Sequence, residues 1–382
     1  MPRMGGSAMA IRFELVKLAQ QEELSIRELC RRFRVSAPTA YKWMKRFASE
    51  GMAGLENRSH CPHRQPRRSS AELEQRVLEL RRKYPVWGPR KLRRLLGDSL
   101  PAPLPSVSTV SAILRRHNLL AAGAPAGDGS VPRRFEYAAP NELWQMDFKG
   151  HFALRHGRCH PLTVLDDHSR FAVGLSACAN EREVTVRERL SAVFRTYGLP
   201  LRILADNGPP FGTAGSEAYS SLEVWLMRLS ITVFHGRPRH PQTQGKDERF
   251  HRTLRLELLH DREFRDLAEA QREFDGWREV YNYVRPHQAL ALEPPASRYR
   301  PSPRAFPEQL PRLEYASELQ VRKVQADAEI RFHNRRFKVG KAFIGFPVAI
   351  RPTLADGVFH LLFAHSVIRT IDLRSPHPLR HV

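Results

Sequence analysis

Three acidic residues occupy positions from which they could meet and bind metal ions. Asp147 interrupts the alternating apolar segment 144–148, Asp206 directly follows the apolar segment 201–205, and Glu248 falls in the first turns of a helical segment. Acids at a strand centre, a strand end and a helix start can converge on one side of a sheet, and buried acids are costly unless paired or metal-bound. Hard oxygen ligands suit Mg²⁺ or Mn²⁺, and two such ions can clamp the attacking and leaving oxygens of a phosphoryl displacement. Any globular domain contains three acids, so spacing alone does not identify the site.

The segments around these acids predict an α/β layer. Strands are expected at 144–148, 162–165, 171–175, 201–205 and 231–234, and helices at 181–197 and 245–260. The first strands are close enough in sequence for antiparallel pairing, and the later ones alternate with helices. This order implies a mixed five-stranded sheet within a multidomain α+β chain.

The chain is long and strongly basic. Its 382 residues contain 62 Lys and Arg against 40 Asp and Glu, which gives a net charge of +22. Such a chain attracts a polyanion, because each cation that neutralises a phosphate releases a condensed counterion. A cationic surface that serves solubility alone is the alternative. Residues 1–138 hold 26 Lys and Arg against 12 Asp and Glu, or +14 of the net charge, so this part is the better candidate for DNA binding.

The first domain, residues 9–57, fits a helix-turn-helix. Its middle helix opens with a capping box of Ser25 and Glu28, and another helix restarts after Ser36 with Pro38 in its first turn. Three short helices with a basic last helix are typical of this motif. A helical bundle that binds nothing is the alternative. The expected DNA contacts are Thr39, Lys42, Lys45 and Arg46.

A basic linker and a second helical domain follow. Residues 58–68 are rich in Pro, His and Arg and show no periodicity, and residues 69–120 show helical spacing. Helices are expected to open at Ser70, Gly88 and Ser108. The linker could follow a phosphate backbone. The expected DNA contacts in these two segments are Arg64, Arg67, Arg68, Arg115 and Arg116.

The rest of the chain divides into linkers and two further domains. Residues 121–138 form a second linker, 139–295 the α/β domain and 296–318 a Pro-rich linker. Short alternating segments within 319–375 predict a small C-terminal β-barrel. This part is basic, and a DNA-binding role and a plain structural cap are both open. Its basic residues include Arg331, Arg335, Arg336, Lys338 and Lys341.

Cysteine usage and hydropathy predict a cytoplasmic protein. The four cysteines form no CxxC pair, which favours a reducing compartment. The fragment 60–63 has the residues of half a zinc site, but no second half stands at ligand spacing. There is no signal peptide and no apolar stretch of about 18 residues, so no membrane contact is expected.

Motifs around the acids resemble the core of DDE transposases and retroviral integrases. The matching segments are Trp144–Phe148, Leu165–Arg170, Asp206–Phe211, His240–His251 and Tyr281–His287. The paired helical domains and the C-terminal β domain also fit bacterial insertion-sequence transposases of this group. Two helix-turn-helix-like units joined by a basic linker would suit recognition of an element's terminal repeat.

The resemblance implies a ribonuclease-H-like fold with Asp147, Asp206 and Glu248 as the catalytic, metal-binding triad. It implies Mg²⁺ as cofactor, two ions, with Mn²⁺ able to substitute. The implied reaction cuts the element end to a 3′-hydroxyl, which then attacks target DNA. The implied partners are double-stranded DNA, both terminal repeats and target, and further copies of the chain in a homo-oligomer on DNA, without a nucleotide cofactor. Lys246 and Arg249 could hold DNA phosphates, and a solvated helix face is the alternative.

The sequence departs from the family pattern in two places. Between Asp206 and Glu248 lie 41 residues, somewhat more than is common, and the excess is expected as a loop near 212–219. Pro210 stands where related proteins carry an acid, so a minor metal or DNA contact is missing.

Other acids and histidines compete with the triad. Asp247 is expected to face solvent, about 100° around the helix from Glu248. Asp166 and Asp167 are expected to shape the second strand. His240 and His251 could orient DNA or water, but packing or solvent exposure is expected for each, and Trp144 is expected in the core.

Two other functions remain open from the sequence. The first is a catalytically silent DNA-binding regulator derived from a transposase. The second is a simple nuclease of the same fold. Intact Asp147, Asp206 and Glu248 argue against the regulator, and paired DNA-binding modules argue against a general nuclease.

Overall fold

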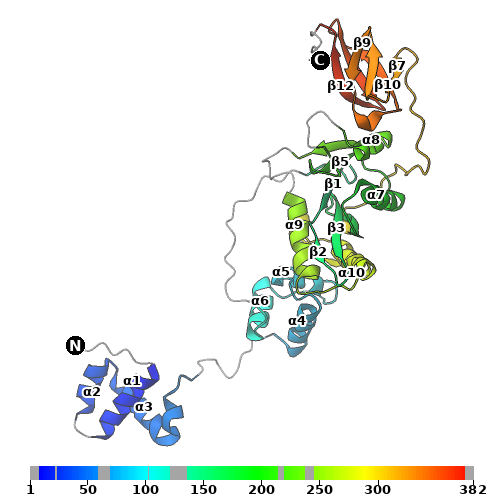
Figure 1. Cartoon of the computed structure of the whole chain (residues 1–382). Helices are drawn as coiled ribbons and strands as arrows, with labels where there is room; N and C mark the ends of the chain where they lie inside the picture. The colour runs from blue at the N-terminus through cyan, green and yellow to red at the C-terminus, as the bar shows by residue number, and fades with distance from the viewer. Residues whose placement is uncertain are drawn as a thin grey trace. The chain divides into compact units, whose positions relative to one another are not determined.

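The structure, a computed structural model, describes residues 8–21, 24–58, 69–101, 103–120, 136–213, 219–236 and 245–374. The chain divides into two compact units, Met1–Ser69 and Ser70–Val382 (Figure 1). Among the described helices, none is long and apolar enough to cross a membrane.

The first unit is a three-helix bundle. Its helices are α1 (Ala8–Gln20), α2 (Ile26–Phe33) and α3 (Ala37–Glu50), and the 3-10 turn η1 (Gly51–Leu55) follows. The predicted cap of α2 is confirmed, because the Ser25 hydroxyl accepts a hydrogen bond from the backbone amide of Glu28 over 3.3 Å. The predicted start of α3 after Ser36 is also confirmed, with a proline in the first turn. The buried core consists of Leu15, Val16, Leu29, Phe33, Ala40 and Leu55.

The second unit begins with another small helical bundle, here called the α4–α6 bundle. Its helices are α4 (Ala71–Lys83), α5 (Pro89–Leu96) and α6 (Val107–Arg116). Ser70 caps α4 and Pro89 starts α5, as predicted, whereas α6 begins earlier than expected because Ser106 is its cap. Its buried core consists of Val77, Trp87, Leu92, Leu96, Val110, Ile113 and Leu114.

A mixed sheet forms the centre of the second unit. Its strands are β1 (Leu143–Phe148), β2 (Phe152–Ala153), β3 (Arg158–Asp166), β4 (Ala172–Cys178), β5 (Arg202–Ala205) and β6 (Thr232–His235). Strands β1, β3 and β4 pair antiparallel, and β1, β5 and β6 pair parallel. The five predicted strands are all present, and the short β2, which pairs with the start of β3, makes the sheet six-stranded.

Helices cover both faces of this sheet, because successive strand residues point to opposite sides. One face packs against α7 (Glu183–Tyr197) and α8 (Ser221–Arg228), for example through Val164 and Trp225. The other packs against α9 (Gly245–Leu254) and α10 (Leu267–Glu279), for example through Leu165 and Phe274. The π-helical turns η2 (Arg255–Leu259) and η3 (Val280–Val284) continue α9 and α10, and the 3-10 turns η4 (Gln288–Leu290) and η5 (Pro295–Ser297) follow.

The C-terminal part is a pair of open sheets. Its strands are β7 (Gln320–Lys323), β8 (Glu329–Phe332), β9 (Arg335–Lys338), β10 (Pro347–Pro352), β11 (Val358–Phe363) and β12 (Ser366–Asp372), with the 3-10 turn η6 (Lys341–Phe343) after β9. The predicted small β-barrel is not confirmed, because these sheets are open. Within the described residues, β7 and β12 are the unpaired edges of a four-stranded sheet, and β8 and β9 form a separate hairpin. Alternating residues predict buried strand faces but do not say whether the edge strands meet.

Candidate active site

Asp147 lies near the end of β1, a central strand of the mixed sheet. It is paired with Thr163 of β3, whose hydroxyl donates a hydrogen bond to the Asp147 backbone carbonyl over 2.9 Å. Trp144 and Met146 are buried in the core, which fixes the strand, and the core position predicted for Trp144 is confirmed. Burial raises the pKa of Asp147 to about 6, and repulsion from Asp206 and Glu181 adds to this shift, against a backbone hydrogen bond from Phe148.

Asp206 follows β5, the parallel neighbour of β1, so both acids lie toward the carboxyl ends of adjacent strands. Its backbone carbonyl lies 2.9 Å from His235 Nδ1, and His235 Nε2 lies 2.9 Å from a carboxylate oxygen of the buried Glu223. Asn207 Nδ2 donates to the Gly236 carbonyl over 2.9 Å. These contacts tie the Asp206 loop to the end of β6.

Glu248 lies in the first turns of α9, as predicted, and its side chain is exposed. Asp247 beside it is 4% exposed, so the prediction that Asp247 faces solvent is wrong. The helix packs on the sheet through Phe250, and the side of α9 that carries Asp247 is buried with it. Burial raises the pKa of Asp247 well above its usual value, and the charges of Asp147 and Asp167 add to this. Its Oδ1 has no hydrogen-bond partner among the described residues.

The pair of Asp147 and Asp206 fits a divalent cation. Both carboxylates are hard oxygen donors. The charges that act on Asp147 are those of Asp206 and Glu181, so a bound cation would relieve the repulsion between these acids. In the described ranges, however, no three His, Cys, Asp or Glu side chains lie close enough together to hold a metal ion. The charge of Asp206 raises the pKa of Asp147, and Glu248 lies on α9, which contacts β1.

Two aspartates after β3 have structural partners. Asp166 accepts hydrogen bonds from the Asn141 amide over 2.7 Å and from the Ser169 amide over 2.8 Å. Asp167 accepts from Gln145 Nε2 over 2.7 Å and forms a salt bridge with Lys246 of α9. Both aspartates are buried, and the expectation that they shape this strand end is confirmed.

The remaining candidate DNA contacts differ in their surroundings. Lys246 is held by Asp167, and Arg116 pairs with Glu74 over 2.9 Å, so neither head group is free in this arrangement. Lys42 and Arg46 lie over the Trp43 ring, at 5.4 and 5.2 Å from its centroid. The Thr39 hydroxyl lies 2.8 Å from that of Ser36. The exposed candidates are Lys42, Lys45, Arg115, Arg116 and Arg249, of which Arg116 is paired with Glu74. Arg64, Arg67, Arg68, His240 and the fragment 60–63 lie outside the described residues.

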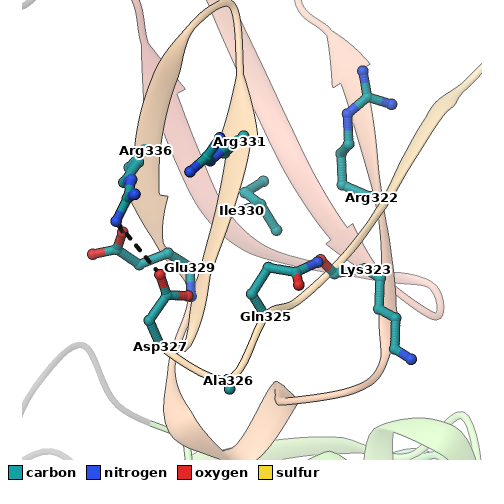
Figure 2. Close-up of a pocket in the computed structure, with 9 residues that line it drawn as sticks. All are labelled: Arg322, Lys323, Gln325, Ala326, Asp327, Glu329, Ile330, Arg331 and Arg336. Atoms are coloured by element: carbon teal, nitrogen blue, oxygen red, sulfur yellow. Dashed lines mark hydrogen bonds and ion pairs between the residues drawn. The ribbon is translucent and has the colours of Figure 1, made fainter.

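A basic hollow lies in the C-terminal part, between β7 and the β8–β9 hairpin. Figure 2 shows Arg322 and Lys323 on one side and Arg331 and Arg336 on the other. Arg336 is partly neutralised by Asp327, 3.7 Å away. The lining holds four basic side chains and two acidic ones, Asp327 and Glu329.

Sequence reasoning missed several residues around the acids. It did not foresee α8, although Ser220 and Glu223 form a capping box whose Ser-x-x-Glu spacing is visible in the sequence. Nothing in the sequence marks His235 as a partner of Glu223. The sequence leaves His251 either packed or exposed to solvent. Its Nε2 lies 2.8 Å from the Thr163 hydroxyl, and burial lowers its pKa to about 4, with a contribution from nearby Lys149.

Comparison with known proteins agrees with this architecture. Residues 138–241 and 229–295 each match the integrase core domain, and residues 8–56 and 39–114 each match a homeodomain-like domain, which is a helix-turn-helix type. Residues 319–378 match the C-terminal domain of IS481 family transposases. The fold and these matches define a protein with an integrase core of ribonuclease-H-like type preceded by helix-turn-helix domains.

Individual relatives come from insertion elements. The chain is 28% identical over 254 residues to the uncharacterized 39.2 kDa protein of insertion element IS476 of Xanthomonas euvesicatoria, which covers 64% of this chain and 69% of that protein. It is 30% identical over 152 residues to the uncharacterized 31.7 kDa protein of IS407 of Burkholderia multivorans, covering 40% and 53%. A solved simian T-cell lymphotropic virus intasome in complex with PP2A regulatory subunit B56 gamma is 17% identical, covering 75% of this chain and 96% of that one, with a TM-score of 0.37. The predicted resemblance to bacterial insertion-sequence transposases with an integrase-type core is confirmed.

Proposed function

We propose that this protein is a DNA transposase that binds the ends of its element, cuts them and joins them to target DNA. The observation that carries the proposal is the pair of Asp147 and Asp206 at the ends of adjacent parallel strands in a core that matches the integrase domain. A cation beside this pair would relieve the repulsion between the two carboxylates. Exposed Glu248 on the neighbouring helix would complete the catalytic set.

Asp147, Asp206 and Glu248 would hold Mg²⁺, or Mn²⁺ in its place, as two ions. When bound, the ions would stabilise the charge that develops on the attacking and leaving oxygens of a phosphodiester. The protein positions the two aspartates from the rigid sheet, and the contacts of His235 and Asn207 hold the Asp206 loop. Glu248 comes from α9, which Phe250 fixes on the core.

The reaction would proceed in two displacements at phosphorus. In the first, water forms a bond to the phosphorus at the element end, and the bond to the 3′-oxygen breaks, which leaves a 3′-hydroxyl and a 5′-phosphate. In the second, that 3′-hydroxyl bonds to a target phosphorus, and the target's 3′-oxygen leaves with the proton. Each step exchanges one P–O bond for another, so neither a nucleotide cofactor nor a covalent enzyme intermediate is needed.

Binding of DNA is proposed for both helical domains. Exposed Lys42 and Lys45 of α3 and Arg115 of α6 could contact phosphates or bases of an element end, and Arg249 could do so near the active site. Since two ends must be joined to one target, a homo-oligomer assembled on DNA is expected. The domain limits 9–57, 69–120, 139–295 and 319–375 remain those proposed from the sequence.

The test is a joining assay with purified protein, Mg²⁺, a labelled duplex of the element's own end and a plasmid target. Wild type is compared with Glu248→Gln, which keeps size and removes the charge, and with Glu263→Gln, a matched change at a carboxylate whose side chain is 85% exposed. We expect wild type and Glu263→Gln to join the end to the plasmid, and Glu248→Gln to bind the end without cutting it.

Two outcomes would contradict the proposal. If wild type binds the end but neither cuts nor joins it with Mg²⁺ or Mn²⁺, the protein acts as a DNA-binding regulator. If it cuts without joining, it is a nuclease of this fold. Equal activity of Glu248→Gln and wild type would remove Glu248 from the catalytic set.

A further inference from the structure

A single carboxylate, that of Glu257, receives hydrogen bonds from both the α4–α6 bundle and the integrase core. Trp87 Nε1 donates to Oε1 over 3.1 Å, and Arg285 Nε donates to the same oxygen over 2.9 Å. Trp277 Nε1 donates to Oε2 over 3.3 Å. Trp87 is 2% exposed and the Glu257 side chain 9%. Because Trp87 lies between α4 and α5 while the other two donors lie in the core, Glu257 joins the two parts of the chain.

An ion pair on α5 makes a second connection. Arg94 Nε donates to one carboxylate oxygen of Glu293 over 3.2 Å, and one of its terminal nitrogens donates to the other over 3.0 Å. This two-point geometry restricts orientation as well as distance. Arg94 also contacts Asp98 of its own bundle over 2.5 Å. Arg94 therefore has one partner within its bundle and one in the core, and the two can be tested separately.

Apolar contacts surround these polar ones. Val280 and Val284 of η3 pack against the buried core of the α4–α6 bundle. Lys91 of α5 lies over the Trp87 ring, 5.7 Å from its centroid. Burial lowers the pKa of Lys91 to about 8, and repulsion from Arg285 contributes, as expected for a cation enclosed between two packed parts. The contact is thus a desolvated interface and not a single surface bridge.

The location of this interface matters for the active site. Glu257 lies in η2, the turn that continues α9, and Glu248 lies earlier on the same helix. A DNA-binding bundle attached here is attached to the element that carries a proposed catalytic carboxylate. We propose that Glu257 and Glu293 are positioning residues, which hold the α4–α6 bundle in one orientation on the core through Trp87 and Arg94. The inference rests on the proposed function.

The consequence is a fixed distance along the bound DNA. If the α4–α6 bundle grips one segment of an element end, its attachment decides which phosphodiester reaches Asp147 and Asp206. A loosened bundle would still bind the end but would deliver neighbouring phosphodiesters, or deliver the correct one less often. The cutting position and rate therefore report on the interface, whereas a structural role within the core would change stability alone.

The first experiment exchanges the charges of the ion pair. All variants carry Asp98→Asn, which removes the partner of Arg94 within the bundle and serves by itself as the control. Arg94→Glu and Glu293→Arg are compared singly and together. We expect each single exchange to lower the rate of correct cutting about tenfold or more, because misplacement of reacting groups by about 1 Å can cost about 100-fold. The double exchange restores the pair and should recover most of the rate and the single cutting position.

The second experiment uses two tryptophans that donate to the same carboxylate. Trp87→Phe removes the donor that comes from the bundle, and Trp277→Phe removes the donor that comes from the core. We expect Trp87→Phe to spread cutting over neighbouring positions with unchanged affinity for the end. Trp277→Phe should leave the cutting position unchanged. Amide hydrogen exchange in α5 of the full-length protein should become faster in Trp87→Phe but not in Trp277→Phe, whether or not DNA is present.

The outcomes separate this inference from the proposed function. If wild type does not cut, the proposed function fails. The interface is tested separately: if amide hydrogen exchange in α5 is the same in wild type, in Trp87→Phe and in both single charge variants, the proposed attachment of the bundle is wrong. If wild type cuts and all variants cut at the same position and rate, the positioning role is wrong. Failure of the double exchange to recover activity, with correct folding shown by circular dichroism, would also overturn it.

Discussion

Asp147→Asn tests the electrostatics of the candidate site without requiring a DNA substrate. In the absence of metal, the folded protein holds the Asp147 carboxylate partly buried and close to other negative charges, so its pKa rises from the ordinary 3.8 to about 6. Asparagine keeps the shape and can still accept the Phe148 hydrogen bond, but it carries no charge. The substitution should therefore stabilise the metal-free protein at neutral pH.

The magnitude follows from the difference in pKa between folded and unfolded chains. Each unit corresponds to about 1.4 kcal/mol, so the full difference is about 3 kcal/mol, and screening at a half-buried side chain reduces it to about 2 kcal/mol. The folded-state pKa is raised, so the protonated acid contributes its full stability below about pH 4, and this is lost as pH rises toward 6. The extra stability of Asp147→Asn over wild type should appear as pH rises from about 4 to about 6 and stay constant at higher pH.

The assay is chemical unfolding of wild type and Asp147→Asn, followed by the fluorescence of the core tryptophans, such as buried Trp144 and Trp225. It is run with a chelator from pH 4.5 to 7.5 and then at pH 7 with increasing Mg²⁺. We expect the variant to be more stable with chelator, and Mg²⁺ to stabilise wild type more than the variant by mass action. A variant that is less stable than wild type at pH 7 without metal, or that gains as much from Mg²⁺, would refute the reasoning.

Three further substitutions test single contacts. Asp247→Asn should stabilise the metal-free core at pH 7, because it replaces a buried carboxylate whose Oδ1 lacks a partner among the described residues; unfolding that is easier than in wild type would contradict this. His251→Gln should reduce the loss of stability toward acid pH. The folded-state pKa of His251, about 4, lies below the ordinary 6.5, so wild type loses up to about 3 kcal/mol of stability as pH falls from 6.5 to 4. The same loss in the variant would argue against a neutral buried histidine. Ser70→Ala should cost about 1 kcal/mol by removing the hydroxyl that accepts the Leu73 amide at the start of α4, with Ser70→Thr as the control that keeps a hydroxyl, and equal stability of all three proteins would disprove the cap's contribution.

Local patterns in the sequence predicted much of the fold. Ser25, Ser70 and Pro89 announce helix starts because short-range hydrogen bonding and a fixed backbone angle act within one turn of the chain. The alternation at 144–148 predicted β1 for a similar reason, since neighbouring strand residues face opposite sides. Each of these signals depends on residues within a few positions of one another.

The errors concern contacts between distant segments. Asp247 is polar and next to an exposed acid, so its burial follows only from how α9 lies on the sheet. The C-terminal strands were foreseen, but whether their edges close depends on β7 and β12, about 45 residues apart, and they do not pair. The helix expected over 245–260 ends in a π-helical turn that aims Glu257 at its three donors.

The sequence by itself determined the kinds of chemistry available to this protein: acids in strand and helix contexts, basic helical domains, and motifs that resemble integrase cores. Only the tertiary structure decided which of these groups are neighbours. It placed Asp147 where the charge of Asp206 raises its pKa, paired Lys246 with Asp167, and attached the α4–α6 bundle to the core through Glu257. The physical reason is that residue type and local spacing set propensities, whereas burial and pairing depend on the packing of segments far apart in the chain.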